Sequence, residues 1–359
     1  MSHLESYDSF QTKKSREKKE RAKARSGKTN IEETDSSFII KKTEEITGTV
    51  IETRYNDATV LYQGNLINAS LKKGLNAVCN QTVFPGDIVI ISQMQPNENI
   101  ITNLLARKNT LSRNKKDSTR ISENAGDNHI IAANVDIAVI VVSAKTPPLH
   151  PKFIDRYLMI LQNSGIDCAI CLNKSDLKTS EDEEILDIYR KIKIPVLETS
   201  TMNNSGIDGL KEILRGKQAI FVGHSGVGKS SLTNSLMDID DIRTSHVSSK
   251  SGKGRHTTTT SKYYVWDEES SIIDTPGIRS LDISSFKPNE IKQYFAEFED
   301  WEGRCRYSNC LHHREPVEGC MVKQAVKAGI ISEERYESYI RILRDLTNDR
   351  KKDDDEIER

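Results

Sequence analysis

The sequence predicts an α/β protein in which a doubly wound parallel sheet follows a small β-barrel and precedes a helical, Cys/His-containing segment. The first observation is that strand-like and helix-like patterns alternate between residues 135 and 277. The second is that five short β-like runs occupy residues 46–105, and the third is that the pattern beyond Phe286 is helical. Alternating strands and helices are typical of a parallel sheet with helices on both faces.

Length and composition are typical of a globular protein with polar tails. The chain has 359 residues, of which 29% are charged and 36% hydrophobic, enough for two or three domains. Residues 1–42 have little apolar content and are expected to be disordered. Residues 13–28 carry nine Lys/Arg and two Glu, which favours an acidic partner such as RNA; a merely solvated tail is the alternative.

The sequence also favours a cytoplasmic protein. The longest apolar run, residues 130–144, is too short to span a bilayer and contains Asn134 and Asp136. The N-terminus lacks the apolar core of a secretory signal. Three of the six cysteines lie within sixteen residues together with histidine, which indicates a metal site in a reducing compartment rather than disulfides.

The first predicted domain is a barrel of the OB type over residues 43–105. Turn signals at Asn56-Asp57 and Pro85-Gly86-Asp87 separate the β-like runs. Such barrels often bind nucleic acid on one face, whereas a purely bracing role is the alternative. The pattern alone leaves an SH3-like barrel open. The runs are 46–53, 58–64, 65–71, 87–93 and 99–105.

The second predicted domain spans residues 106–285 and begins with a polar, basic linker, residues 106–128. The continuous apolar run 135–144 predicts a parallel strand covered on both faces. Cys168 and Cys171 lie on another predicted strand, where alternation puts their side chains on opposite faces. That does not suit a shared metal, so we interpret both as core residues. Further strands are predicted at 167–173, 218–224, 261–267 and 270–277, and helices at 151–165, 206–216 and 230–237.

A phosphate-binding loop follows the strand 218–224. The stretch GHSGVGKS matches the Walker A pattern, in which glycines let backbone N–H groups surround phosphates and the next helix directs its N-terminus at them. Lys229 would reach the β/γ oxygens and assist catalysis, and Ser230 would bind Mg²⁺. The motif alone does not separate ATP from GTP. The predicted residues are Gly223, His224, Ser225, Gly226, Val227, Gly228, Lys229, Ser230 and Ser231.

Two later segments complete a predicted magnesium and γ-phosphate site. Asp274, in DTPG, ends an apolar strand and would hold Mg²⁺ through water, while the Gly277 N–H would sense the γ-phosphate. The polar segment 248–264 contains Thr257–Thr260. One of these threonines, which we take to be Thr258, would place its hydroxyl on Mg²⁺. A plain Ser/Thr loop is the alternative.

The tetrapeptide NKSD follows the strand 167–173 and predicts a guanine-reading loop. Asp176 would accept hydrogen bonds from N1–H and N2–H₂ of guanine, a pair that adenine lacks. Asn173 would brace the loop, and Lys174 would lie along the purine. Ser200 and Thr201, in ETSTMNNSG, would back the base.

The order of these motifs is unusual, because the base-reading loop normally comes well after the phosphate loop. Here Asn173 precedes Gly223 by fifty residues. The core of a parallel sheet does not depend on where the chain is cut, so circular permutation explains the order without discarding either motif. The sequence therefore predicts a circularly permuted P-loop GTPase domain. An ATP-dependent P-loop enzyme is the rival interpretation.

Four potential zinc ligands define the third predicted domain, residues 286–359, which ends in a polar tail. They are Cys305, Cys310, His312 and Cys320. Four sulfur and nitrogen donors with none left for substrate predict a closed structural Zn²⁺ site. His313 is an alternative to His312. The nearby arginines that such a site would present to RNA are Arg304, Arg306 and Arg314.

Residues 44–345 resemble one family, the small-ribosomal-subunit-dependent GTPases called RsgA (YjeQ/YloQ). The resemblance rests on NKSD before GHSGVGKSSL, on GRHTTTT, on DTPGI and on the Cys/His cluster followed by KQAVKAGIISEERYESYIRIL. It implies a monomer that binds a late precursor of the small subunit and its rRNA, and hydrolyses GTP when that subunit stimulates it. The rivals are a non-enzymatic RNA-binding assembly factor and a permuted GTPase of the large subunit.

The residue that positions the attacking water is a separate question. Many GTPases carry Gln directly after the DxxG glycine, but this chain has Ile278, which cannot orient water. His256, in GRHTTTT, is the nearest candidate, because an imidazole nitrogen accepts a hydrogen bond or a proton near neutral pH. The family resemblance also places a His here. Capping or packing of the loop by His256 is the alternative.

Overall fold

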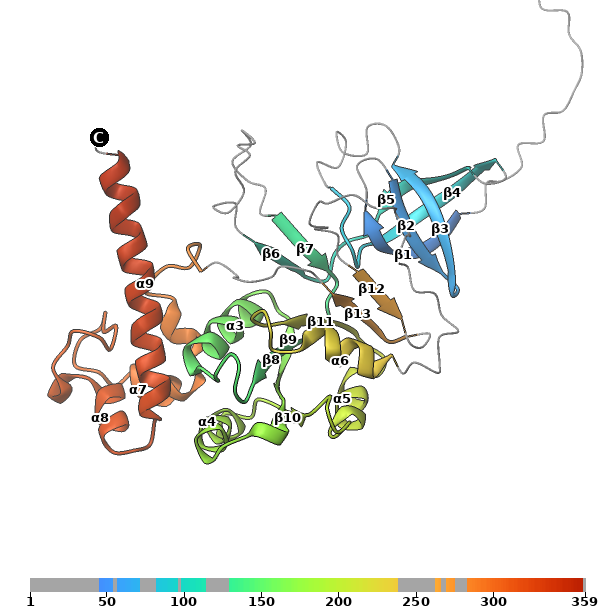
Figure 1. Ribbon diagram of the computed structural model, residues 1–359. Helices are drawn as coiled ribbons and strands as arrows, with labels where there is room; N and C mark the ends of the chain where they lie inside the picture. Colours follow the sequence, from blue (N-terminus) through green and yellow to red (C-terminus); the bar gives the residue numbers. More distant parts are fainter. Residues whose placement is uncertain are drawn as a thin grey trace, which may run out of the picture. The chain divides into compact units, whose positions relative to one another are not determined.

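The computed structural model describes residues 45–53, 57–71, 82–95, 98–113, 129–237, 262–265, 269–274 and 283–357 (Figure 1). The basic segment 1–42 and three predicted site residues, His256, Thr258 and Gly277, lie outside this range. Among the described residues, no helix combines the length and the apolar character that crossing a membrane requires.

The N-terminal described strands close into a barrel. Each of the predicted β-like runs forms a strand: β1 Glu45–Thr53, β2 Asp57–Tyr62, β3 Asn65–Leu71, β4 Ile88–Gln95 and β5 Glu98–Leu104. Their order is β1-β2-β3-β5-β4, with β4 pairing back to β1. Alternate apolar side chains, such as Val50, Val60 and Ile91, fill the interior and are fully buried. The prediction of an OB-type barrel is confirmed.

The segment predicted as a linker contains a strand. β6, Thr110–Arg113, pairs antiparallel with β7, His129–Ala133, in a separate two-stranded sheet. The physical reason is Leu111, an apolar residue in an otherwise polar run, whose side chain is fully buried together with Ala132. Residues 114–128 lie outside the described residues.

A six-stranded sheet forms the centre of the α/β domain. Its strands are β8 Ile137–Ser143, β9 Asp167–Asn173, β10 Val196–Thr199, β11 Gln218–Val222, β12 Lys262–Val265 and β13 Ser271–Asp274. The order is β10-β9-β8-β11-β13-β12, and only β12 is antiparallel to its neighbour. Every residue of β8 is buried, as its apolar run predicts.

Helices cover both faces of this sheet. Helices α3, Pro151–Asn163, and α4, Ser180–Lys191, contribute to one apolar cluster, and α5, Ile207–Leu214, and α6, Lys229–Leu236, contribute to another. Cys168 packs against the first cluster and Cys171 belongs to the second, so the two thiols lie on opposite faces as predicted. Helix α4 and strand β10 were not among the predicted elements. The start of α4 does carry a local signal, a capping box between Thr179 and Asp182.

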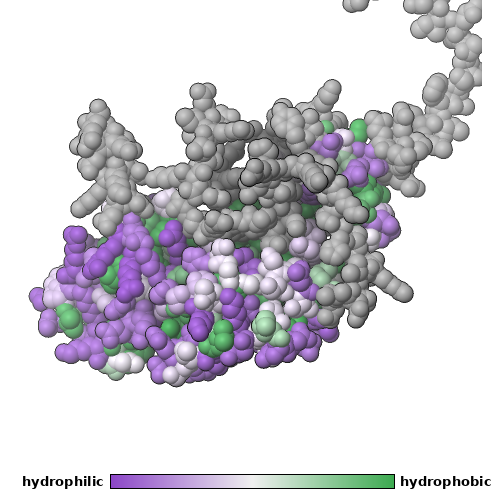
Figure 2. All heavy atoms as spheres, viewed as in Figure 1, coloured by the Kyte–Doolittle hydropathy of each residue, from purple (hydrophilic) through white to green (hydrophobic). Residues whose placement is uncertain are grey.

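Beyond Phe286 the regular elements of the described residues are helical, as predicted. Its elements are η3 Ile291–Tyr294, η4 Ala296–Phe298, α7 Glu299–Glu302, η5 Val317–Gly319, α8 Met321–Lys327 and α9 Glu333–Ile357. Phe295, Phe298 and Tyr339 form its aromatic core, with ring centroids 5.1–5.3 Å apart. On the face shown in Figure 2, the coloured residues are mostly hydrophilic and the hydrophobic ones are scattered.

Candidate functional site

The strand order creates a switch point between β8 and β11. From β8 the chain builds the sheet outward through β9 and β10, whereas from β11 it builds in the opposite direction through β13. Ligands of open α/β sheets bind beyond the carboxyl ends of the strands at such a point. The phosphate loop directly follows β11, and the NKSD loop begins at Asn173, the last residue of β9. The two motifs, fifty residues apart in the sequence, therefore share one edge of the sheet.

The glycines of the phosphate loop are required by its backbone. Gly228 has a φ of 98°, and a Cβ on it would lie 2.2 Å from Nδ2 of Asn173. Gly223 has a φ of 154°, and a Cβ there would lie 2.3 Å from the Val141 carbonyl oxygen. Lys229, the first residue of α6, donates from Nζ to the carbonyls of Gly223 and His224, each at 2.8 Å. Its ammonium group thus lies over the loop at the N-terminus of α6, where a phosphate would be attracted.

Direct hydrogen bonds join the base loop to the phosphate loop. Asn173, which is 1% exposed, donates from Nδ2 to the Val227 carbonyl at 2.9 Å and accepts at Oδ1 from Thr199 Oγ1 at 3.3 Å. Lys174 donates from Nζ to the carbonyls of Gly226 (2.8 Å) and Thr146 (2.7 Å). A shift of either loop therefore displaces groups that are hydrogen-bonded to the other loop.

The acceptor predicted to read guanine is held by the predicted base-backing loop. Ser200 is fully buried and its Oγ donates to Oδ1 of Asp176 at 2.5 Å. Backbone hydrogen bonds between Ser200 and Ser205 close the turn that contains Thr201. Asp176 itself is exposed, so its carboxylate is both oriented by Ser200 and accessible to a ligand.

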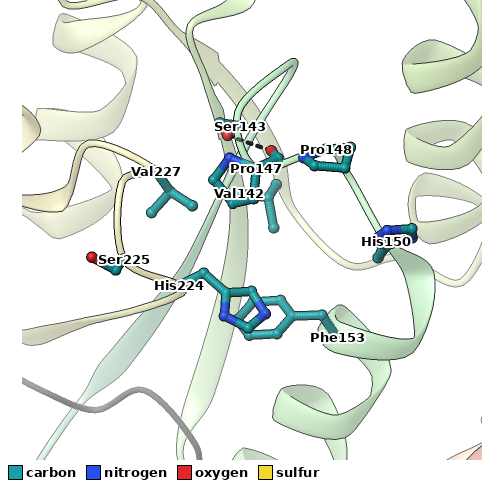
Figure 3. A pocket seen from close by; sticks show the side chains of 9 residues that line it. All are labelled: Val142, Ser143, Pro147, Pro148, His150, Phe153, His224, Ser225 and Val227. Atoms are coloured by element: carbon teal, nitrogen blue, oxygen red, sulfur yellow. Dashed lines mark hydrogen bonds between the residues drawn. The ribbon is translucent and has the colours of Figure 1, made fainter.

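A cavity of about 360 Å³ adjoins the phosphate loop (Figure 3). Phe153 of α3 stacks on His224, with ring centroids 4.0 Å apart. Partial burial and the charge of Lys229 lower the pKa of His224, which favours the neutral form of its ring. The prediction did not include Phe153. The sequence feature that could have indicated this cavity was TPPLHP, which follows the carboxyl end of the central strand β8 and supplies several of the lining residues. The lining residues are Val142, Ser143, Pro147, Pro148, His150, Phe153, His224, Ser225 and Val227.

The predicted magnesium side is described in part. Ser230 lies in the first turn of α6, and Asp274 ends β13 next to β11. Lys262, the first residue of β12, pairs with Asp274, and the predicted threonines Thr257–Thr260 lie outside the described residues.

The four predicted zinc ligands converge. The donor atoms of Cys305, Cys310, His312 and Cys320 all lie within 4.8 Å of one another. Nδ1 of His312 lies 3.2 Å from Cys310 Sγ, 3.4 Å from Cys320 Sγ and 3.7 Å from Cys305 Sγ. Burial lowers the pKa of His312 to about 4, so the imidazole is in the neutral form that binds metal. Three sulfurs and one nitrogen fit a closed structural Zn²⁺ site.

His313, the alternative ligand, is not part of this cluster. Its backbone N–H donates to Oε2 of Glu315 at 2.9 Å, while Leu311 N–H donates to Oε1 of the same carboxylate. The φ of His312 is 55°, a left-handed backbone conformation. The side chains of His312 and His313 therefore leave the backbone in different directions.

Fold and site together define a P-loop GTPase with a circularly permuted domain. The chain belongs to the RsgA GTPase family, whose model matches residues 104–284. It is 38% identical over 267 residues to the small ribosomal subunit biogenesis GTPase RsgA of Moorella thermoacetica, covering 74% of this chain and 86% of the relative. The protein of the same name from Thermotoga petrophila is 37% identical over 277 residues, 76% of this chain and 87% of the relative.

Solved structures agree with this assignment. YjeQ from Thermotoga maritima superposes with a TM-score of 0.67 at 32% identity, covering 85% of this chain and 99% of that one. YloQ, described as a circularly permuted GTPase, has a TM-score of 0.63 at 24% identity and covers 86% of this chain and 97% of its own, which supports the fold. The protein is thus a GTP hydrolase, and the prediction of a permuted GTPase is confirmed.

Proposed function

We propose that this protein binds Mg²⁺·GTP across its two joined loops and hydrolyses it on the small ribosomal subunit, assisting late maturation of that subunit. The observation that carries the nucleotide assignment is the bond from Asn173 to Val227, which unites the base and phosphate loops although 54 residues separate them. The permuted order of the motifs therefore corresponds to one continuous nucleotide surface. The curated relatives' names supply the partner.

The roles of individual residues follow from this arrangement. Asp176, oriented by Ser200, reads guanine, and Thr201 contributes to the backing of the base. Residues 223–231 hold the phosphates, with Lys229 stabilising charge on the β/γ oxygens. The hydroxyls of Ser230 and Thr258 would hold Mg²⁺ directly, and the Asp274 carboxylate would hold it through water. Gly277 responds to the γ-phosphate.

The flanking domains would bind ribosomal RNA. The domain division we propose is an arm (1–42), a barrel (43–105), the GTPase domain (106–285) and a zinc domain (286–359). Cys305, Cys310, His312 and Cys320 would hold one Zn²⁺, which would stabilise the last of these domains. The protein would act as a monomer in the cytoplasm, free of membranes. Cosedimentation with separated subunits tests the partner: binding to large subunits alone would contradict it.

His256 is the residue we assign to positioning the attacking water, because Ile278 cannot do so. Basal turnover should be low and small subunits should stimulate it strongly. His256→Ala should lower the stimulated turnover by roughly 10²- to 10⁴-fold, the usual contribution of an acid–base group, with GTP affinity unchanged. Single-turnover hydrolysis with and without small subunits measures this.

A matched variant is His150→Ala, which removes an exposed histidine lining the cavity beside the phosphate loop. It should keep full stimulation. Full stimulation in His256→Ala would instead make that histidine structural and assign the water to a ribosomal group.

A further inference from the structure

A hydrogen-bonded junction links the barrel to strand β12. Its four residues, here called the junction, are Gly86, Asn134, Gln218 and Tyr263. They come from the turn before β4, the β7–β8 connection, the start of β11 and β12. None of them belongs to the nucleotide or zinc sites described above.

The barrel side of the junction is a close backbone contact. Gly86 has a φ of 90°, and a Cβ on it would lie 2.1 Å from the Ala133 carbonyl oxygen. Asn134 donates from Nδ2 to the Gly86 carbonyl at 2.9 Å, and the Ala133 N–H donates to the Pro85 carbonyl at 3.0 Å. The barrel turn is therefore held directly against residues 133–134.

Gln218 connects that contact to β12, using both ends of its amide. Nε2 donates to the carbonyls of Ala133 (2.8 Å) and Asn134 (2.9 Å). Oε1 accepts from the Tyr263 hydroxyl at 2.6 Å. The amide is planar and rigid, so a shift of the 133–134 backbone would rotate it. That rotation would move Oε1, the acceptor of the Tyr263 hydrogen bond.

Tyr263 carries the connection along the sheet. It is 8% exposed, its hydroxyl also bonds Ser271 Oγ at 2.9 Å, and its ring shares an apolar cluster with Ile51 of β1. Tyr263 pairs with Ile273, one residue before Asp274, and β12 begins two residues after Thr260, the last of the predicted switch threonines. Displacing Tyr263 therefore moves the strand that follows the predicted switch threonines.

We propose that Gln218 and Tyr263 are positioning residues that transmit subunit binding at the barrel to β12, and so to the magnesium side of the GTPase site. This inference rests on the proposed function. The route is a contiguous set of hydrogen bonds and buried contacts, and energetic coupling between sites is reciprocal. Subunit binding should shift β12 toward the position that GTP favours, and GTP should in turn tighten subunit binding.

Two variants interrupt the route at opposite ends. Tyr263→Phe removes one oxygen and both of its hydrogen bonds. Asn134→Gly removes the bond to the Gly86 carbonyl, and also the bond that Oδ1 accepts from the Lys108 N–H, while tolerating the φ of 55° at that position. Each should lower subunit-stimulated kcat and should abolish the tightening of subunit binding by GTP, which for such coupling is about 5- to 150-fold in affinity, with basal turnover and the KM for GTP within about twofold of wild type.

The double variant should lose no more than the stronger single variant, since both interrupt one route. Tyr189→Phe is the control: it removes a buried tyrosine hydroxyl with two hydrogen bonds, to Pro151 O and Asp155 Oδ1, away from the junction. It should keep full stimulation. A second readout needs no hydrolysis: a non-hydrolysable GTP analogue should tighten binding to small subunits in wild type and in Tyr189→Phe, and should lose this effect in Tyr263→Phe.

The outcomes separate the two proposals. Wild-type protein that small subunits do not stimulate would contradict the proposed function, and the junction proposal with it. Stimulation of wild type that persists in Tyr263→Phe and Asn134→Gly would overturn the junction alone. An equal loss in Tyr189→Phe would also overturn it, because the effect would then reflect general loosening of the domain.

Discussion

Among single residues, Asp176 is expected to decide which base is bound. We expect Asp176→Asn to shift preference from GTP toward XTP by on the order of 10⁴-fold, because xanthine offers an acceptor where guanine has its amino group. Competition of labelled GTP and labelled XTP by unlabelled GTP, XTP and ATP measures the shift. Ser200 orients the carboxylate at 2.5 Å and can hold the substituted amide as well, so the fold should be retained.

Asp208→Asn is the matched control, since it neutralises an exposed carboxylate in the first turn of α5. It should leave both affinities unchanged. Unchanged GTP affinity in Asp176→Asn would remove the NKSD loop from the site, and effective competition by ATP in wild type would favour the ATP-dependent rival.

At the level of an element, we expect the stability of the segment between α7 and α8 to depend on a metal ion held by its clustered Cys and His side chains. We expect His312→Ala to lose zinc and to lower the unfolding temperature of the protein, because zinc binding stabilises small domains by about 10–16 kcal/mol. His313→Ala should retain one zinc ion per chain, since the structure leaves its ring outside the cluster. Elemental analysis and thermal unfolding with and without a chelator measure both effects.

The opposite result would make His313, instead of His312, the histidine ligand of the zinc. Zinc retained in His312→Ala and lost in His313→Ala would mean that the loop rearranges around the metal. Zinc retained in both variants would mean that the three cysteines hold it with a different fourth ligand.

Across the whole molecule, one arginine joins the zinc domain to the GTPase domain. Arg335 of α9 is 3% exposed, donates to Asp155 of α3 and bonds Glu297 at 2.6 and 3.0 Å. Its guanidinium also lies 4.4 Å from the centroid of the Phe295 ring. We expect Arg335→Met to lower the free energy of unfolding by about 3–5 kcal/mol, because it leaves Asp155 buried without its cation.

Urea unfolding measures this cost, with Arg341→Met as the control. Arg341 pairs with Glu337 in an exposed ion pair, so its loss should cost less than about 1 kcal/mol. Burial raises the pKa of Asp155, and the Arg335 charge opposes that rise. Without Arg335 the pKa of Asp155 rises further, so the cost of Arg335→Met should shrink as the pH falls and Asp155 becomes protonated. A cost that stays constant with pH would contradict this account.

Most of the secondary structure followed from local patterns. The apolar run of β8 and the alternating runs of the barrel predicted strands that the structure contains, because burial on one or two faces sets the spacing of apolar residues. Strand β6 was missed: one buried Leu in a basic segment is too weak a local signal. Helix α4 was also missed, although its capping box at Thr179 was available.

The nucleotide and metal motifs could be recognised locally because their chemistry constrains neighbouring residues. A phosphate loop needs glycines at positive φ, as at Gly228, and a closed zinc site needs several soft donors close together. The sequence order of these motifs was also enough to indicate circular permutation. GTPase activity could therefore be predicted from these motifs, and the family was indicated by the resemblance that the same motifs carry.

Contacts between distant segments could be identified only in the folded structure. Asp155 and Arg335 are 180 residues apart, Gln218 and Ala133 are 85 apart, and neither pair carries a sequence signal. The choice between His312 and His313 likewise depends on a backbone conformation that two adjacent identical residues do not reveal. Local sterics act between neighbours and leave a pattern in the sequence, whereas a buried polar pair is selected by the packing of whole elements against each other.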